Sequence, residues 1–439
     1  MAEGRLLRLL GVSFGVAVTV GGTVGAGILR TPGLVAAQLL DPWRILGVWG
    51  LGGVYALIGT LCVVELGAAL PSAGGWYVYS RRAFGDACGF AVGWTDWLAQ
   101  SAALAYLSVS VGDFAAVLWP RVASDAKLTA LLTLATFTAI QWLGLRSSSW
   151  TQEATSLLKG AALLILVALC FLHRPAPEAL SVAASTLRPG LTLAGLMLAL
   201  QAIIGTYDGW YTAIYFTEED RDPGRNLPRG ALGGVACTIG LYLLFNLGLM
   251  HVLSVKTLAE SSLPAATAAQ AIFGGSGGAI VTALALASLL SVINAVLMLA
   301  TRILFAVARD GLFAQRATVV NRGGTPVTAM LLTTVAAAGL VLSGTFQQLL
   351  AVQSVLLVGV YASGFLALLT LRRREPELPR PFRVPGYPWT PLLMLAVSAA
   401  FLVANVAGDL RSSALALGLL AASYPAYRLL ARGRDRRAG

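Results

Sequence analysis

Long apolar runs alternate with short polar connections along the whole chain. A helix needs roughly 20 apolar residues to cross the hydrocarbon core of a bilayer. Twelve runs of about this length are found, at approximately 11–39, 44–70, 88–118, 127–144, 154–172, 191–217, 229–254, 277–308, 327–343, 347–370, 390–407 and 412–430. The sequence has no alternating strands of the barrel type, so helices must satisfy the backbone groups in lipid. The pattern predicts an all-α integral membrane protein with twelve transmembrane helices.

Two of these runs are interrupted by glycine in a matching way. The first contains GGTVGAGIL at 21–29, and the sixth contains IIGTYDGW at 203–210. Close helix packing is the simpler explanation for one such cluster. Two clusters that open consecutive sets of five spans indicate inverted repeats whose broken helices meet at the midplane. The expected divisions are a ten-helix inverted-repeat core over 1–370, with repeats at about 11–172 and 191–370, and a cytoplasmic linker, two more helices and a basic tail over 371–439.

The chemistry of a broken helix suits an amino acid. Unwinding exposes backbone N–H groups where the helix dipole is positive and C=O groups where it is negative. The carboxylate of a substrate can bind the former and its ammonium the latter. Glycine allows the ligand to approach the backbone closely. Such a site needs no charged side chain.

Composition and charge support a membrane protein. Hydrophobic residues make up 57% of the 439 residues and charged residues only 12%, outside the range of soluble domains. The net charge of +11 does not indicate nucleic acid, because most of the 31 lysine and arginine residues fall on one side if the N-terminus is cytoplasmic. This is the positive-inside pattern, and it predicts a multi-pass protein of the cell (plasma or inner) membrane with both termini in the cytoplasm. The four cysteines lie within the apolar runs and imply no disulfide framework.

Several segments resemble the amino acid-polyamine-organocation superfamily of transporters, and within it the L-type amino acid transporters and their bacterial relatives. The resemblance covers nearly the whole chain. The matching segments are VGAGILRTPG (24–33), VELGAALPSAGGWYVY (64–79), the stretch 207–229 that ends in TEEDRDPGRNLPR, ARDGLF (308–313), Thr325-Pro326 and RPFRVPGYP (380–388).

The resemblance implies the LeuT-like fold, with five plus five inverted helices, the first and sixth broken, and two peripheral helices. It places the substrate carboxylate on the backbone of Gly25, Ala26 and Gly27. The substrate amino group is then expected near the carbonyls of Thr23, Gly205, Thr206 and Asp208, with Tyr207 and Asn294 as candidates for pocket lining. Lys159 matches a lysine that takes the place of a sodium ion in sodium-independent members.

Three departures from the family pattern change the expectations. Ala26 replaces a common serine, and Gly205 stands where members with bulky substrates often have an aromatic gate. The loop 119–127 has no cysteine, so a disulfide-linked ancillary subunit is not expected. We expect a single polypeptide that works alone.

Some residues allow two interpretations. Asp208 could cap a half-helix or face the pocket and favour cationic substrates. Asn294 could line the site or bond between helices. Lys159 could extend to the interface or bond carbonyls near Gly21 and Gly22. For Glu65 we expect an ion pair with an arginine rather than proton transfer.

Asp96 and Gln100 are spaced four apart on the third expected span, which puts them on one helix face. A buried polar contact between the two is the favoured interpretation.

The function predicted from these features is sodium-independent secondary transport of amino acids by alternating access, as an exchanger, a uniporter or a proton-coupled carrier. A carrier of amines or polyamines is the alternative within transport, and a nutrient receptor that does not transport is another class. No cluster of acid, base, nucleophile or metal ligands indicates an enzyme, and no cofactor, metal or nucleotide signature is found in the sequence. The expected partners are the amino acid substrate and the lipid bilayer, without nucleic acid.

Overall fold

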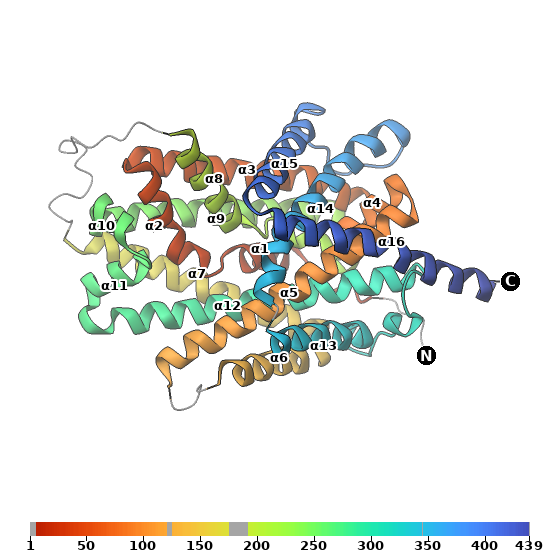
Figure 1. Cartoon of the computed structure of the whole chain (residues 1–439), viewed down its shortest axis with the longest axis horizontal. Helices are drawn as coiled ribbons and strands as arrows, with labels where there is room; N and C mark the ends of the chain where they lie inside the picture. The colour runs from red at the N-terminus through yellow and green to blue at the C-terminus, as the bar shows by residue number, and fades with distance from the viewer. Residues whose placement is uncertain (1–5, 121–124, 175–191, 345, 439) are drawn as a thin grey trace.

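The computed structural model describes residues 6–120, 125–174, 192–344 and 346–438, and these form a bundle of α-helices (Figure 1). The helices of the first half are α1 (Val12–Thr23), α2 (Gly27–Leu39), α3 (Pro42–Ala69), α4 (Trp76–Phe84), α5 (Asp86–Leu118), α6 (Ala126–Trp142) and α7 (Leu145–Leu172). Those that follow are α8 (Leu193–Tyr207), the 3-10 helix η2 (Thr212–Glu219), α9 (Pro223–Val252), α10 (Val255–Glu260), α11 (Pro264–Phe273), η3 (Gly274–Ser276) and α12 (Gly277–Arg309). The last are η4 (Gln315–Thr318), α13 (Val327–Ser343), α14 (Phe346–Arg374), α15 (Trp389–Gly408) and α16 (Leu410–Ala438).

The all-α prediction is confirmed for the described residues, which contain only two isolated β-bridges and no strand. Seven helices in this part of the chain are long and apolar enough to cross a membrane, or eight if the bent pair α1 and α2 is one span. The other expected spans correspond to shorter helices, such as α6 and α13 with 17 residues each and α8 with 15, or to α16. The two ends of the chain lie at the same end of the bundle (Figure 1).

Burial along the helices separates a centre from a periphery. The apolar window of the stretch Pro264–Arg309, which includes α12, is 78% buried, and that of α15 is 17% buried. Helix α12 packs on α5, α7 and α13, so it forms the middle of the bundle. Helix α15 exposes Leu392, Leu393 and Val403, which suits a helix that faces lipid.

Three short helices were not predicted from the sequence. Helix α4 has only nine residues and includes Arg81 and Arg82, so no apolar run marks it. Helices α10 and α11 have six and ten residues, too few to span a bilayer. Helix α7 begins at Leu145, nine residues before the apolar run, because its first turns are polar but still helical.

Both glycine-rich runs are broken. Helix α1 ends at Thr23 and α2 begins at Gly27, with a bend of 51° between the two. Helix α8 ends at Tyr207, and the chain continues as the 3-10 helix η2 from Thr212. Gly209 has a φ of +110°, a conformation that a residue with a side chain rarely adopts, so glycine is required at this turn.

Candidate functional site

The break between α1 and α2 presents bare backbone. Gly25 and Ala26 are half-buried and Gly27 is exposed, although their neighbours Val24 and Ile28 are buried. The Gly25 N–H donates to the carbonyl of Thr23 at 2.9 Å, while Gly27 opens the first turn of α2, where amide groups have no partner within the helix. This is the arrangement that can bind a carboxylate.

The two breaks lie against each other. A Cβ atom on Gly209 would lie 2.6 Å from the carbonyl of Gly22 and 2.8 Å from the nitrogen of Thr23, so only a glycine permits this approach. Next to it, the hydroxyls of Thr31 and Thr206 are 2.7 Å apart. The amide groups of one break and the carbonyl groups of the other therefore border a common region.

Tyr242 on α9 connects the breaks, and no feature of the sequence marks it as a site residue. Its hydroxyl is 3.0 Å from the carbonyl oxygen of Thr23 and 3.1 Å from that of Thr206. These are two of the carbonyls at which the substrate amino group was expected. The Thr206 carbonyl has a second lone pair, so an ammonium group can bind there beside the tyrosine, whereas the Thr23 carbonyl also accepts the Gly25 N–H.

Lys159 on α7 is fully buried and bonds to the first broken helix. Its Nζ donates to the carbonyl of Gly21 at 2.7 Å and to that of Val24 at 2.6 Å. The side chain therefore does not extend to the interface. Because α1 ends here, these carbonyls lack helical partners, and the ammonium group supplies one.

Two further residues of α7 continue this contact and were not selected from the sequence. Ser156 donates to the carbonyl of Ala17 at 2.8 Å, and Gln152 lies 3.3 Å from the hydroxyl of Ser291 on α12. Ser156 and Gln152 precede Lys159 by three and seven residues, which puts all three on one helix face. Polar residues at this spacing in an apolar span are the signal that could have identified them.

Asp208 lines a cavity of about 170 Å³ between α3, α8, α14 and α15. Its carboxylate accepts from the hydroxyl of Tyr361 at 2.7 Å. Gly205 lies on the same wall, and a Cβ there would meet no atom within 4 Å. The polar atoms of Gln201, Ser398 and Asn405 add hydrogen-bonding groups to the lining. The structure thus places Asp208 on a cavity, and the absence of a bulky side chain at Gly205 leaves that cavity open.

Tyr207 and Asn294 lie outside this lining. Tyr207 is fully buried, and its hydroxyl donates to the carbonyl of Trp49 on α3 at 3.3 Å. Asn294 donates to Gln152 at 2.9 Å and to the carbonyl of Ser148 at 3.2 Å. Of the two interpretations of Asn294, the contacts are those of a residue that bonds between helices.

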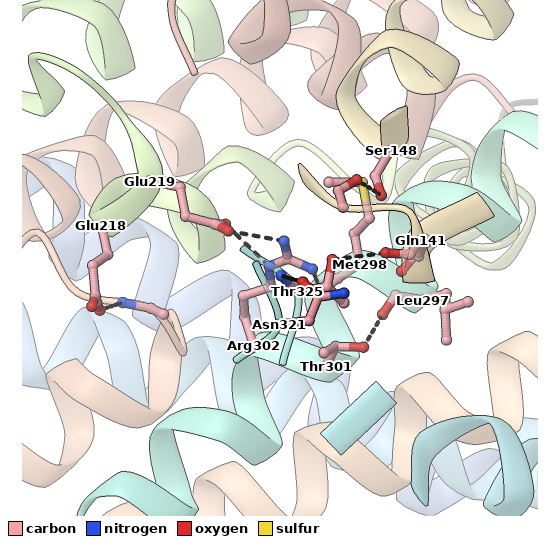
Figure 2. A network of polar contacts seen from close by, with 12 residues as sticks. Gln141, Ser148, Glu218, Glu219, Leu297, Met298, Thr301, Arg302, Asn321 and Thr325 are labelled. Carbon is pink, nitrogen blue, oxygen red and sulfur yellow. Dashed lines mark hydrogen bonds and ion pairs between the residues drawn. The ribbon is translucent and has the colours of Figure 1, made fainter. Parts of the chain in front are cut away.

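An ion pair between Glu219 on η2 and Arg302 on α12 lies in a network of polar contacts (Figure 2). Glu219 accepts from Arg302 through both carboxylate oxygens, at 2.9 and 3.0 Å, and both side chains are buried. The carbonyl of Glu219 also accepts the amide groups of Leu9 and Leu10, each at 3.0 Å. The segment before α1 is therefore tied to η2 by main-chain bonds.

Comparisons with known proteins agree with these features. The sequence model of a family described as amino acid permease matches residues 9–419. The chain is similar to the serine/threonine exchanger SteT of Bacillus subtilis, with 27% identity over 434 residues, which are 97% of each chain. It is also similar to Asc-type amino acid transporter 1 of Mus musculus, with 28% identity over 86% of this chain and 73% of that protein. For b(0,+)-type amino acid transporter 1 of Homo sapiens the identity is 25%, over 91% of this chain and 83% of that protein.

Proposed function

Because the chain belongs to the amino acid permease family, within the amino acid-polyamine-organocation superfamily, we propose that it is a sodium-independent secondary transporter of amino acids. It works by alternating access, as an exchanger, a uniporter or a proton-coupled carrier. The relatives named above are exchangers or transporters of amino acids by name, which supports this class over the amine carrier and the receptor.

The proposed architecture has twelve spans and the LeuT-like inverted repeat. The core covers 1–370, with repeats at about 11–172 and 191–370, and 371–439 holds the peripheral helices; residue 191 lies outside the described part. The two matching breaks support the repeat. Two chain ends at one end of the bundle agree with an even number of spans. The charge bias supports cytoplasmic termini in the cell membrane.

The observation that carries the proposal is the contact between the two breaks. The backbone of Gly25, Ala26 and Gly27 binds the substrate carboxylate, with the Gly25 N–H shared with the carbonyl of Thr23. The carbonyl of Thr206, on the other break, lies beside Tyr242, which also bonds that of Thr23. Opposite partial charges on facing half-helices bind a zwitterion without ionised side chains. A change in the bend of either helix alters this geometry, which links binding to alternating access.

Sodium independence rests on Lys159. A lysine at the centre of a membrane helix costs about 2.5–3.5 kcal/mol on insertion scales. The two hydrogen bonds of Lys159 to the first broken helix offset part of this cost, and a lysine kept there at such a cost is expected to be functional. The ammonium group supplies the positive charge that a sodium ion would otherwise bring to these carbonyls.

Uptake of labelled amino acids into proteoliposomes tests the proposal. Uptake should be equal in sodium and in choline buffers for the wild type, and Lys159→Ala should transport poorly in both. Lys127→Ala is a control, since Lys127 is in the first turn of α6 and lies away from the site. Strict sodium dependence, or an unimpaired Lys159→Ala variant, would contradict the role of the lysine. Binding without uptake would indicate a receptor, and uptake of amines alone would indicate an amine carrier.

We further propose that the chain transports without an ancillary subunit. The four cysteines are free in the structure, and 119–127 carries none, although 121–124 lies outside the described residues. The proteoliposome experiment uses the purified chain alone and therefore tests this proposal as well.

A further inference from the structure

Two carboxylates inside the bundle have neutral partners only. Glu65 and Glu219 each pair with an arginine. Asp96 is fully buried, and Asp208 lines the cavity described above. Among the described residues, neither aspartate forms an ion pair with a lysine, arginine or histidine. A charge in such surroundings is costly unless it is neutralised.

A chain of hydrogen bonds joins these two aspartates. The Gln100 side-chain nitrogen lies 3.2 Å from a carboxylate oxygen of Asp96 and 3.5 Å from the hydroxyl of Tyr211. The hydroxyls of Tyr211 and Tyr361 are hydrogen-bonded, and Tyr361 donates to Asp208 at 2.7 Å. An amide nitrogen has two hydrogens, so Gln100 can give one to Asp96 and the other to the tyrosines that lead to Asp208.

Among the described residues, the groups around these hydrogen bonds include no cation that compensates the two carboxylates. The titratable groups that face it are Tyr211 and Tyr215, which flank the start of η2, Tyr361 on α14, Tyr55 on α3 and Tyr79 on α4. The guanidinium of Arg302, on the adjacent α12, is bonded to Glu219 instead. Two ionised carboxylates that share these donors would repel each other across a medium of low dielectric.

We propose that Asp96 binds a proton, and that a cationic group arriving at Asp208 displaces it. The inference rests on the proposed function, because it assigns a cationic substrate to the cavity. While the cavity holds no cation, one proton on the pair relieves the repulsion. When a lysine or arginine side chain pairs with Asp208, its positive charge replaces that proton. The O–H bond of Asp96 breaks, the carboxylate keeps the electron pair, and the proton passes to water.

The Tyr215 hydroxyl next to Asp96 suits both forms of the carboxyl group, because a hydroxyl can donate to the carboxylate or accept from the protonated acid. Tyr215 donates to Asp96 at 2.6 Å, a short bond of the kind that stabilises a carboxylate. Beside Tyr215 lies Tyr79, whose fully buried hydroxyl has no hydrogen-bond partner among the described side chains and backbone. This hydroxyl lies close to Gly67 on α3, so the polar groups continue from Asp96 toward the end of the bundle where Glu65 lies.

Proton release on binding tests the inference. Lysine is added to the purified protein in weakly buffered detergent solution with a pH indicator, over a series of pH values, and alanine serves as the neutral probe. The wild type should release up to about one proton per lysine bound. It should release fewer with alanine, which brings no cationic side chain to Asp208. By linkage, a cation that displaces a proton should also bind more tightly at higher pH. Asp96→Asn should bind lysine with no proton release.

Two further variants complete the test. Ser108 lies on α5, as Asp96 does, and its buried hydroxyl has no hydrogen-bond partner among the described residues. The control variant Ser108→Ala should therefore release protons as the wild type does. Tyr215→Phe keeps the carboxylate but removes its donor, so release should occur at a higher pH; it replaces Asp96→Asn if that variant does not fold. Lysine binding without proton release in the wild type, or unchanged release in Asp96→Asn, overturns the inference. Uptake of neutral amino acids in the proteoliposome experiment would leave the proposed function standing in that case.

Discussion

At the scale of single residues, a substitution of Gly27 tests whether the exposed backbone binds the substrate carboxylate. A Cβ at this position would lie 3.6 Å from Thr206, an ordinary contact, so the fold tolerates a side chain there. Gly27→Val should insert into the membrane normally but lose substrate binding, because its methyl groups cover the amide groups at the start of α2. Thermal-shift measurements with amino acids report the loss.

Gly240→Val is the matched control for Gly27→Val. Gly240 lies within α9, and a Cβ there meets no atom within 4 Å, so binding should be retained. Wild-type affinity in Gly27→Val would show that the substrate carboxylate does not bind at this position.

Asp208→Asn distinguishes the two interpretations of that residue. If the carboxylate faces the substrate side chain, the variant should lose lysine and arginine binding and keep that of neutral amino acids. Loss of a buried charge pair of this kind amounts to about 2–5 kcal/mol, or more than tenfold in affinity. Competition against a labelled neutral amino acid measures both classes in one experiment. Equal losses for both classes would instead support the capping role.

Residues differ in how far their roles could be predicted from the sequence. The glycines and Lys159 are unusual in a membrane span, so the sequence marks them. Tyr242 and Tyr361 are not unusual, because tyrosine is compatible with an apolar helix and its role depends on which carbonyl or carboxylate the fold brings to its hydroxyl. Tyr207 is a candidate for pocket lining in the sequence, but in the structure its hydroxyl donates to the carbonyl of Trp49.

At the scale of elements, Glu65 joins α3 to the end of α14 and to the linker that follows. It accepts from Arg372 at 2.6 and 2.7 Å and from the amide of Val384 at 2.7 Å, and Arg380 lies 3.3 Å away. The expected ion pair is thus present, and it fixes the proline-rich linker whose sequence alone predicts only that the helix ends.

Glu65→Gln should therefore destabilise the protein. Removing one partner of a buried pair costs about 3–5 kcal/mol; the 19% exposure of Arg372 puts the expected loss near the lower end. Glu375→Gln is the control, since its partner Arg82 is 57% exposed and the pair is worth about 0–1 kcal/mol. Thermal unfolding in detergent compares the two variants, and equal midpoints would show that Glu65 does not hold the linker.

The elements predicted best are those whose apolar run exceeds the thickness of a bilayer. Helices α3, α5 and α9 begin and end within a few residues of the expected spans, except for the polar first turns of α9. Helix α4 cannot be found from hydropathy, because Trp76–Phe84 is too short for a span. It is held by packing on α5 and α14. Helix α4 ends at Phe84, and Gly85, which follows it, has a positive φ of 90°.

At the scale of the whole molecule, apolar length indicates which helices are long enough to cross a membrane but not which of them lie at the centre. The stretch Pro264–Arg309, which includes α12, and helix α15 have similar mean hydropathy, 2.3 and 2.0 over their apolar windows, yet the first is largely buried and the second largely exposed. The difference arises from tertiary packing: buried serine, asparagine and arginine residues of α12 bond to α7 and η2, while α15 makes few such bonds. Contacts of this kind depend on the partner and not on the average composition of a helix.

The main-chain bonds between the segment before α1 and η2 can report how often this end of the bundle opens. Leu9 and Leu10 donate to the carbonyl of Glu219, and Arg221 donates back to Leu10 at 3.1 Å. Amide hydrogens held this way exchange with deuterium only when the bonds open, so their exchange rate measures how often this end of the bundle comes apart. Arg302→Gln frees the Glu219 side chain and should speed exchange at Leu9 and Leu10 while that at Leu253, at the far end of α9, stays unchanged. If exchange at Leu9 and Leu10 in Arg302→Gln stays at the wild-type rate, the ion pair does not control how often the segment before α1 separates from η2. Access to the site is then controlled elsewhere in the chain.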